Sequence, residues 1–126
     1  MKTIKLFFTA AILLVTVSFA KAQDTKHLLY HPGDFGPKLT TSTVKVYGAC
    51  GSCKHRIQNA LRVEGIKAAN WDENTEFLTV QYNDKIIHLD KIQALVAAVG
   101  HDTEKVRAND LVYNALPDCC HYPRRS

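Results

Sequence analysis

The pattern of apolar residues predicts an α+β domain whose elements follow the order β-α-β-β-α-β. Three observations carry this prediction: short stretches in which alternate residues are apolar, two longer stretches with apolar residues three and four positions apart, and clusters of turn residues between them. Alternation is typical of half-buried strands, and the second spacing is typical of amphipathic helices. In this order the elements make a ferredoxin-like βαββαβ sandwich, with a four-stranded antiparallel sheet and both helices on one face.

The first strand and the first helix flank a short loop. Residues 43–47 alternate, with Val44 and Val46 on one face, which predicts a strand. The stretch 51–63 has helical spacing, and Gly65 is placed to end that helix. The apolar positions of this helix are Cys53, Ile57, Ala60 and Leu61.

Two further strands and a second helix follow. Residues 66–71 and 77–82 are predicted to be strands, and the polar cluster at 72–75 is a turn between them. Apolar residues at i, i+3, i+4 and i+7 predict the second helix, with Gly100 just past its end. These apolar residues are Ile92, Leu95, Val96 and Val99. We expect residues 101–106 to form the fourth strand.

Residues 1–22 have the features of a secretory signal peptide. A basic start precedes an apolar stretch at 6–20, and Ala20-Lys21-Ala22 fits the small-x-small rule for cleavage after Ala22. The apolar stretch is shorter than the roughly 18 residues that a membrane span needs, so we do not expect the cleaved chain to span a membrane. We therefore expect a secreted or periplasmic protein, in a compartment where disulfides persist.

The remaining chain divides into three segments. Residues 23–42 contain prolines and glycines without a sustained period and are expected to be a linker or arm. Residues 43–107 form the domain, and residues 108–126 form a C-terminal tail, in which residues 110–116 are long enough for about two helical turns. Loss of three lysines with the signal peptide leaves 13 basic against 12 acidic residues, which lowers the net charge from +4 to +1. Nucleic-acid surfaces need clustered cations, so we expect no nucleic-acid partner.

Cys50-Gly51-Ser52-Cys53 lies where the first strand gives way to the first helix. Unpaired N–H groups and the helix dipole favour thiolates there. Two thiolates on an exposed loop suit a soft metal ion: Cu(I) accepts two sulfurs, whereas Zn(II) prefers four ligands. A thiol–disulfide redox pair is a second interpretation. It is less favoured, because no proline lies between Cys53 and Val106 to face the pair. A structural disulfide and a structural zinc site remain as further alternatives.

The run from Val44 to Val106 resembles the heavy-metal-associated domain of copper chaperones, of metal-pumping ATPases and of the periplasmic mercury-binding protein. The likeness rests on the CxxC position, on the element order, and on apolar positions in both helices and the third strand. By this resemblance Cys50 and Cys53 are the metal ligands. The implied ion is Cu(I) first, with Zn(II) or Hg(II) as alternatives, and the implied partner is a metal-transporting membrane protein or another metal carrier.

Two features depart from the family pattern. The family usually has Gly-Met-Thr before the first cysteine, with the Met supporting the loop from inside, and here Tyr47-Gly48-Ala49 stand there. His101 follows Gly100, at a place where the family often has Tyr, Phe or Lys. His101 is therefore a candidate third ligand or a donor to a ligand, with an exposed loop histidine as the alternative. We expect His55 to be solvated and His88 to lie at the start of the second helix.

The tail ends with Cys119-Cys120-His121, a further set of candidate ligands. In an extended segment Cys119 and His121 point to one side and Cys120 to the other. If the fourth strand ends opposite the CxxC loop, residues 107–118 reach back to Cys50 only when largely extended, which disfavours a joint site. The alternatives are a second metal site, shared between chains in a metal-bridged dimer, or a disulfide with another cysteine.

The sequence contains no nucleophile–base pair and no phosphate loop, so we do not expect an enzyme. The prediction is an exported, copper chaperone-like protein that binds a soft metal ion through its CxxC loop and passes it on. The alternatives are an exported thiol–disulfide protein and a structural domain that carries a disulfide.

Overall fold

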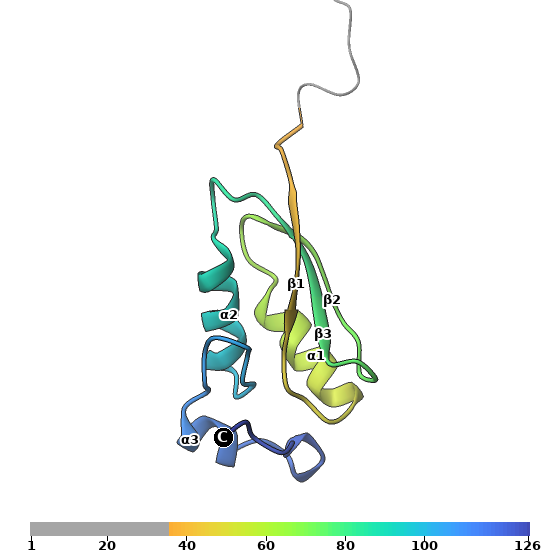
Figure 1. Ribbon diagram of the computed structural model, residues 1–126, viewed down its shortest axis with the longest axis vertical. Helices are drawn as coiled ribbons and strands as arrows, with labels where there is room; N and C mark the ends of the chain where they lie inside the picture. Colours follow the sequence, from red (N-terminus) through yellow and green to blue (C-terminus); the bar gives the residue numbers. More distant parts are fainter. Residues whose placement is uncertain (1–35) are drawn as a thin grey trace, which may run out of the picture. The chain divides into compact units, whose positions relative to one another are not determined.

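The computed structural model describes residues 36–126, so the expected signal peptide and most of the expected arm lie outside the described residues. Figure 1 shows the described elements. They are β1 (Thr40–Lys45), α1 (Gly51–Ala60), β2 (Ile66–Trp71), β3 (Phe77–Tyr82), α2 (Leu89–Ala98), α3 (Asp110–Asn114) and the 3₁₀ turn η1 (Asp118–Cys120). Within residues 36–126, no helix has both the length and the apolar character that crossing a membrane requires.

The sheet is antiparallel and has the strand order β1-β3-β2. The predicted bounds of β2 and β3 are those of the structure, whereas β1 begins three residues before the predicted start at residue 43. Along β3 every second side chain is buried, as the alternation predicted. Val44, Leu78 and Trp71 lie opposite one another across the three strands, so the sheet presents a continuous apolar row to the core.

One hydrophobic core joins the sheet to both long helices. Ile57 of α1, its C-cap residue Leu61, and Ile92 and Val96 of α2 belong to the same buried cluster as the apolar row of the sheet. The helical spacing predicted all four positions. The core also contains residues from the tail, namely Leu116, Cys120 and Tyr122. The tail is therefore part of the packed domain.

The prediction of a fourth strand at residues 101–106 is wrong, because pairing stops after one isolated bridge, Val46 to Thr103. The Thr103 side chain bonds locally instead: its hydroxyl donates to the Gln93 side-chain oxygen at 2.9 Å and accepts the Val106 N–H at 3.0 Å. Such local bonds compete with a sheet ladder. The chain turns back at once, and the Ala108 N–H donates to the carboxylate of Asp102 at 2.7 Å.

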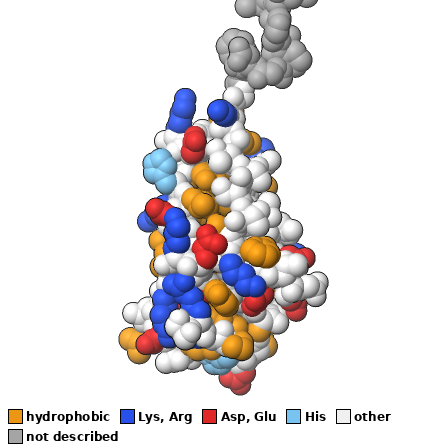
Figure 2. All heavy atoms as spheres, viewed as in Figure 1, with side chains coloured by type: hydrophobic (Ala, Val, Ile, Leu, Met, Phe, Trp, Pro, Cys, Tyr) orange, Lys and Arg blue, Asp and Glu red, His pale blue; other side chains and the backbone are white. Residues whose placement is uncertain are grey.

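Basic and acidic side chains are interspersed on the face of the domain that Figure 2 shows. The ion pairs of the domain include Lys45 with Glu76 at 2.9 Å and Lys105 with Asp90 at 3.2 Å. The second pair is largely exposed, and such pairs contribute little to stability.

Candidate metal centre

The CxxC pair lies at the N-terminus of α1. Cys50 is the N-cap residue, and its carbonyl oxygen accepts the N–H groups of Cys53 at 2.9 Å and Lys54 at 3.2 Å. The two sulfurs are 3.6 Å apart. Cys53 is fully buried and its sulfur accepts the Ala49 N–H at 3.4 Å, whereas Cys50 is half-buried. The pair thus has one inner sulfur and one sulfur that solvent reaches.

The tail brings two more sulfurs to this pair, contrary to the expectation that a joint site is disfavoured. The Cys120 sulfur is 3.8 Å from that of Cys50 and 3.8 Å from that of Cys119. The sulfurs of Cys50, Cys119 and Cys120 all lie within 4.8 Å of one another. All four cysteines are free thiols.

Two structural features bring the cysteines of the tail to the CxxC loop. The chain reverses after Thr103, so the tail starts beside the CxxC loop and does not have to span the length of the sheet. The segment is also not extended at the cysteines: η1 is a 3₁₀ turn, in which the Cys120 N–H donates to the Pro117 carbonyl oxygen at 2.8 Å. The turn buries Cys120 and leaves Cys119 exposed.

Within residues 36–126, the histidines do not join the sulfurs. Among the described residues, the group with metal-ligand spacing consists of cysteines alone. His101 is fully buried, its Nδ1 lies 2.9 Å from the Tyr47 carbonyl oxygen, and its Nε2 has no hydrogen-bond partner. Burial lowers the pKa of His101, against the opposing effect of its bond to Tyr47. His101 therefore supports the residue that leads into the CxxC loop.

The other histidines of the described part of the chain lie outside the cluster as well. The exposed His121 lies against the Tyr113 ring, with 5.2 Å between the centroids. His55 is exposed, as predicted, and its Nδ1 is 3.0 Å from the Asn59 side-chain nitrogen. His88 is the N-cap residue of α2 and makes no side-chain capping bond.

Tyr122 fastens the tail to the segment that holds His101. Its hydroxyl accepts the Asp102 N–H at 2.7 Å and donates to the Gly100 carbonyl oxygen at 2.8 Å. Its ring stacks on that of His101 with 5.6 Å between centroids, and its carbonyl oxygen accepts from the Tyr113 hydroxyl at 2.6 Å. Tyr122 is 2% exposed, so these bonds lie in the core.

Arg124 also holds the tail in place, through a bidentate ion pair with Asp102. Its Nη2 lies 2.6 Å from Oδ1 and its Nε 3.0 Å from Oδ2, and the carboxylate is fully buried. Burial opposes the ionisation of Asp102, but hydrogen bonds from Arg124 and from the Ala108 N–H hold its pKa below the usual 3.8. The guanidinium also lies over the Tyr113 ring, 4.5 Å from its centroid. Neither contact was predicted from the sequence; the signal was Tyr122 and Arg124, which stand two and four positions after Cys120.

Trp71 takes the place of the supporting methionine that the family has at position 48. Gly48 is buried, and a Cβ atom on it would lie 2.7 Å from the Trp71 ring and 3.2 Å from the Cys53 Cβ. The indole N–H donates to the Val46 carbonyl oxygen at 2.9 Å, which fixes the ring under the loop. The support therefore comes from the end of β2, and glycine is needed at 48 because the indole fills that space.

The pKa values of Cys50 and Cys120 are shifted in opposite directions. Burial of Cys50 opposes ionisation, but hydrogen bonds from the Cys53 N–H and from the neighbouring thiols together lower the pKa of Cys50 from 9.0 to about 7. Burial and the donation of its own proton to neighbouring sulfurs raise the pKa of Cys120 well above its usual value. Of these two thiols, Cys50 therefore ionises first.

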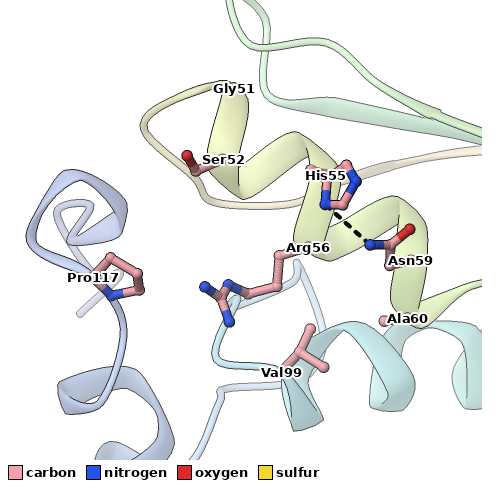
Figure 3. Close-up of a pocket in the computed structure, with 8 residues that line it drawn as sticks. All are labelled: Gly51, Ser52, His55, Arg56, Asn59, Ala60, Val99 and Pro117. Carbon is pink, nitrogen blue, oxygen red and sulfur yellow. Dashed lines mark hydrogen bonds between the residues drawn. The ribbon is translucent and has the colours of Figure 1, made fainter.

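A hollow of about 720 Å³ lies beside the cluster, between α1 and the tail. Figure 3 shows the Arg56 side chain crossing it toward Pro117. The full lining is Gly51, Ser52, His55, Arg56, Asn59, Ala60, Val99 and Pro117. None of the four cysteines is among these residues, so the hollow is distinct from the sulfur cluster.

The fold and the cluster define a small ferredoxin-like domain with thiols at the start of its first helix. Residues 39–102, half of the chain, match the heavy-metal-associated domain. The chain belongs to the heavy-metal-associated domain family, which confirms the resemblance seen in the sequence. Cys119 and Cys120 lie beyond the matched residues.

Two solved structures illustrate the similarity. Oxidized MerP from Ralstonia metallidurans CH34 is 23% identical, with a TM-score of 0.50, over 53% of this chain and 96% of that one. The N-terminal domain of a potential copper-translocating P-type ATPase from Bacillus subtilis, in the Cu(I)-loaded state, is 25% identical, with a TM-score of 0.50, over 52% of this chain and 85% of that one. Comparison with curated proteins found no match.

Proposed function

We propose that this protein binds a soft metal ion through Cys50 and Cys53 and passes it to another protein. The observation that carries the proposal is the pair of free sulfurs 3.6 Å apart at a helix N-terminus. One sulfur is buried and the other is half-buried, so an ion held between them remains within reach of an incoming donor. The membership in the heavy-metal-associated domain family supports the same function.

The donor set favours a thiophilic ion. Every member of the cluster is a sulfur, with no imidazole or carboxylate within it. Soft thiolate ligands select Cu(I), Zn(II) and related ions over hard cations. We take Cu(I) as the first expectation, because the Bacillus subtilis neighbour at 25% identity was solved with Cu(I). Zn(II) and Hg(II) are the alternatives.

The proposed setting is outside the cytoplasm. The basic and apolar start of the chain, with its small-x-small end at Ala22, supports export and cleavage. The proposed partner is a metal-transporting membrane protein or another carrier, and the protein acts by binding and transfer rather than as an enzyme. Mass spectrometry of the protein purified from cells that express the full chain tests the cleavage: an uncleaved N-terminus would contradict the export proposal.

A Cu(I) titration tests the binding. The protein purified from such cells is fully reduced under anaerobic conditions and titrated against a competing chelator. We expect the wild type to bind Cu(I) tightly and the double variant Cys50→Ser/Cys53→Ser to lose this binding. Ser52→Ala, in the same loop, is the matched control and should bind like the wild type. Tight binding by the double serine variant would refute the proposed function.

A thiol–disulfide function is the second candidate, because the pKa of Cys50 is lowered to about 7. A lowered pKa favours the nucleophilic thiolate. Insulin reduction measures this activity directly. Turnover that disappears in Cys50→Ser, together with weak Cu(I) binding by the wild type, would favour the redox function over metal transfer.

A further inference from the structure

We propose that the C-terminal tail completes the metal site within a single chain, with Cys120 as a third sulfur ligand and Cys119 as an exchangeable ligand at the surface. This inference rests on the proposed function of the CxxC loop and assigns the tail a part in it. The tail lies beyond residues 39–102, which match the family, so the additional ligands are a feature of this chain.

The spacing of the sulfurs is that of a shared ion. A metal–sulfur bond is about 2.3 Å long, so two sulfurs of a tetrahedral site are separated by about 3.8 Å, and two opposed sulfurs of a linear site by about 4.6 Å. The sulfur of Cys50 is 3.6 Å from that of Cys53 and 3.8 Å from that of Cys120. Both separations match the edge of a tetrahedral site, and the Cys119 sulfur also lies within 4.8 Å of those of Cys50 and Cys120.

The approach of the tail is held by buried bonds and does not depend on the sulfurs alone. On the far side of the cysteines, Tyr122 is bonded to the backbone of Gly100 and Asp102. On the near side, Leu116 packs against Gly100, where a Cβ atom would lie 2.9 Å from the leucine side chain. With both flanks fixed, Cys120 is directed into the core beside the CxxC loop.

The four sulfurs differ in how far solvent reaches them. Cys53 and Cys120 are fully buried, Cys50 is half-buried and Cys119 is exposed. The inner sulfurs are therefore placed to retain an ion. Cys119 is placed to receive the ion first and to be displaced first by the thiol of a partner, since an exposed ligand exchanges without movement of the core.

A metal site formed by one chain and a site shared between two chains predict different oligomeric states for the loaded protein. Three sulfurs from one chain leave no need for a second molecule, so the loaded protein should remain monomeric. A metal-bridged dimer would require the sulfurs of the tail to face a neighbour, whereas Cys120 faces Cys50 of its own chain.

The test counts the sulfurs around bound copper. The reduced protein is loaded with one equivalent of Cu(I), and copper K-edge X-ray absorption gives the coordination number while sedimentation gives the mass. We expect three or more sulfurs in a monomeric wild type and one sulfur fewer in Cys120→Ser. The same variant should bind Cu(I) at least about tenfold more weakly, because loss of even an outer partner of a ligand costs 10–100-fold.

Further variants separate the possible failures. Asp118→Ser changes the same turn without removing a sulfur and should keep the wild-type coordination number. Cys119→Ser should retain at least three sulfurs, because it leaves Cys50, Cys53 and Cys120 in place. It should slow Cu(I) transfer to a competing thiol. Two sulfurs in the wild type, an unchanged number in Cys120→Ser, or a dimer would overturn this inference. Those results would not contradict the proposed function. The proposed function is refuted only if Cys50→Ser/Cys53→Ser still binds Cu(I) tightly.

Discussion

Replacing Arg124 with glutamine tests whether the tail is an integral part of the domain. Arg124 is 12% exposed, and its partner carboxylate on Asp102 is fully buried. The substitution keeps a side chain of similar reach but removes the positive charge and the two-pronged contact. The buried carboxylate then loses its counter-ion while remaining in the core.

The expected loss in the free energy of unfolding is about 3 kcal/mol. Removing one partner of a buried ion pair typically costs 3–5 kcal/mol, because an uncompensated charge is left behind. We place the loss at the low end of that range for two reasons. The Ala108 N–H still donates to Asp102 at 2.7 Å, and release of the tail would let water reach the carboxylate.

Urea unfolding measures this loss through the fluorescence of Trp71, which is the single tryptophan of the chain and lies in the core. The protein is kept reduced and free of metal, so that the folded domain alone is measured. Arg125→Gln is the matched control: it removes the same charge from the neighbouring residue but leaves the Asp102 pair intact. We expect the control to unfold at nearly the wild-type urea concentration.

The difference between Arg124→Gln and the wild type should depend on pH in a defined direction. The pKa of Asp102 is depressed in the folded protein, so its contribution to stability is present above 3.8 and is lost as the pH falls through the lower folded value. The deficit of the variant should therefore be largest at neutral pH and should shrink as the pH falls from 3.8 through the depressed folded pKa of Asp102. An equal loss in Arg125→Gln, or a deficit that grows in acid, would refute the reasoning.

Three further predictions follow from the site. Gly48→Ala should lower the free energy of unfolding by about 1–3 kcal/mol, measured by urea unfolding, because the new Cβ overlaps the Trp71 ring, and an unchanged midpoint would contradict this packing. Tyr122→Phe should cost about 1–3 kcal/mol in a thermal or urea unfolding experiment, since a buried N–H and a buried carbonyl oxygen lose their partner. Alkylation of Cys50 should accelerate as the pH rises through about 7 and then level off, whereas Cys120 should stay unreactive over that range, as peptide mapping would show.

The part of the fold that depends on local pattern was predictable. The bounds of β2 and β3 follow from alternation and from the turn residues between them, and the buried faces of α1 and α2 follow from helical spacing. The fourth strand was not predictable in this way. Residues 101–106 look like a strand by position, but Thr103 satisfies its hydrogen bonds with Gln93 and Val106, and no periodic pattern reports such a contact.

The candidate site was predictable only in its first half. The CxxC spacing and its place before a helix mark Cys50 and Cys53 from the sequence alone. The approach of Cys120 depends on the pair between Asp102 and Arg124, which are 22 positions apart and have no regular spacing. The support of the loop by Trp71 was hidden for a similar reason, since its partner Gly48 lies on another element.

The contact between Cys50 and Cys120 joins positions 70 residues apart, and the intervening chain contains both long helices and two of the three strands. Any bond that runs through both sulfurs turns this chain into a closed loop. Confining an unfolded chain in a loop of 70 residues is worth about 4 kcal/mol in the chain-entropy description. That amount is a large share of the stability of a domain this small. A metal ion bound by both sulfurs would therefore also stabilise the fold. The resistance of the protein to heat and to proteases would report whether the ion is bound.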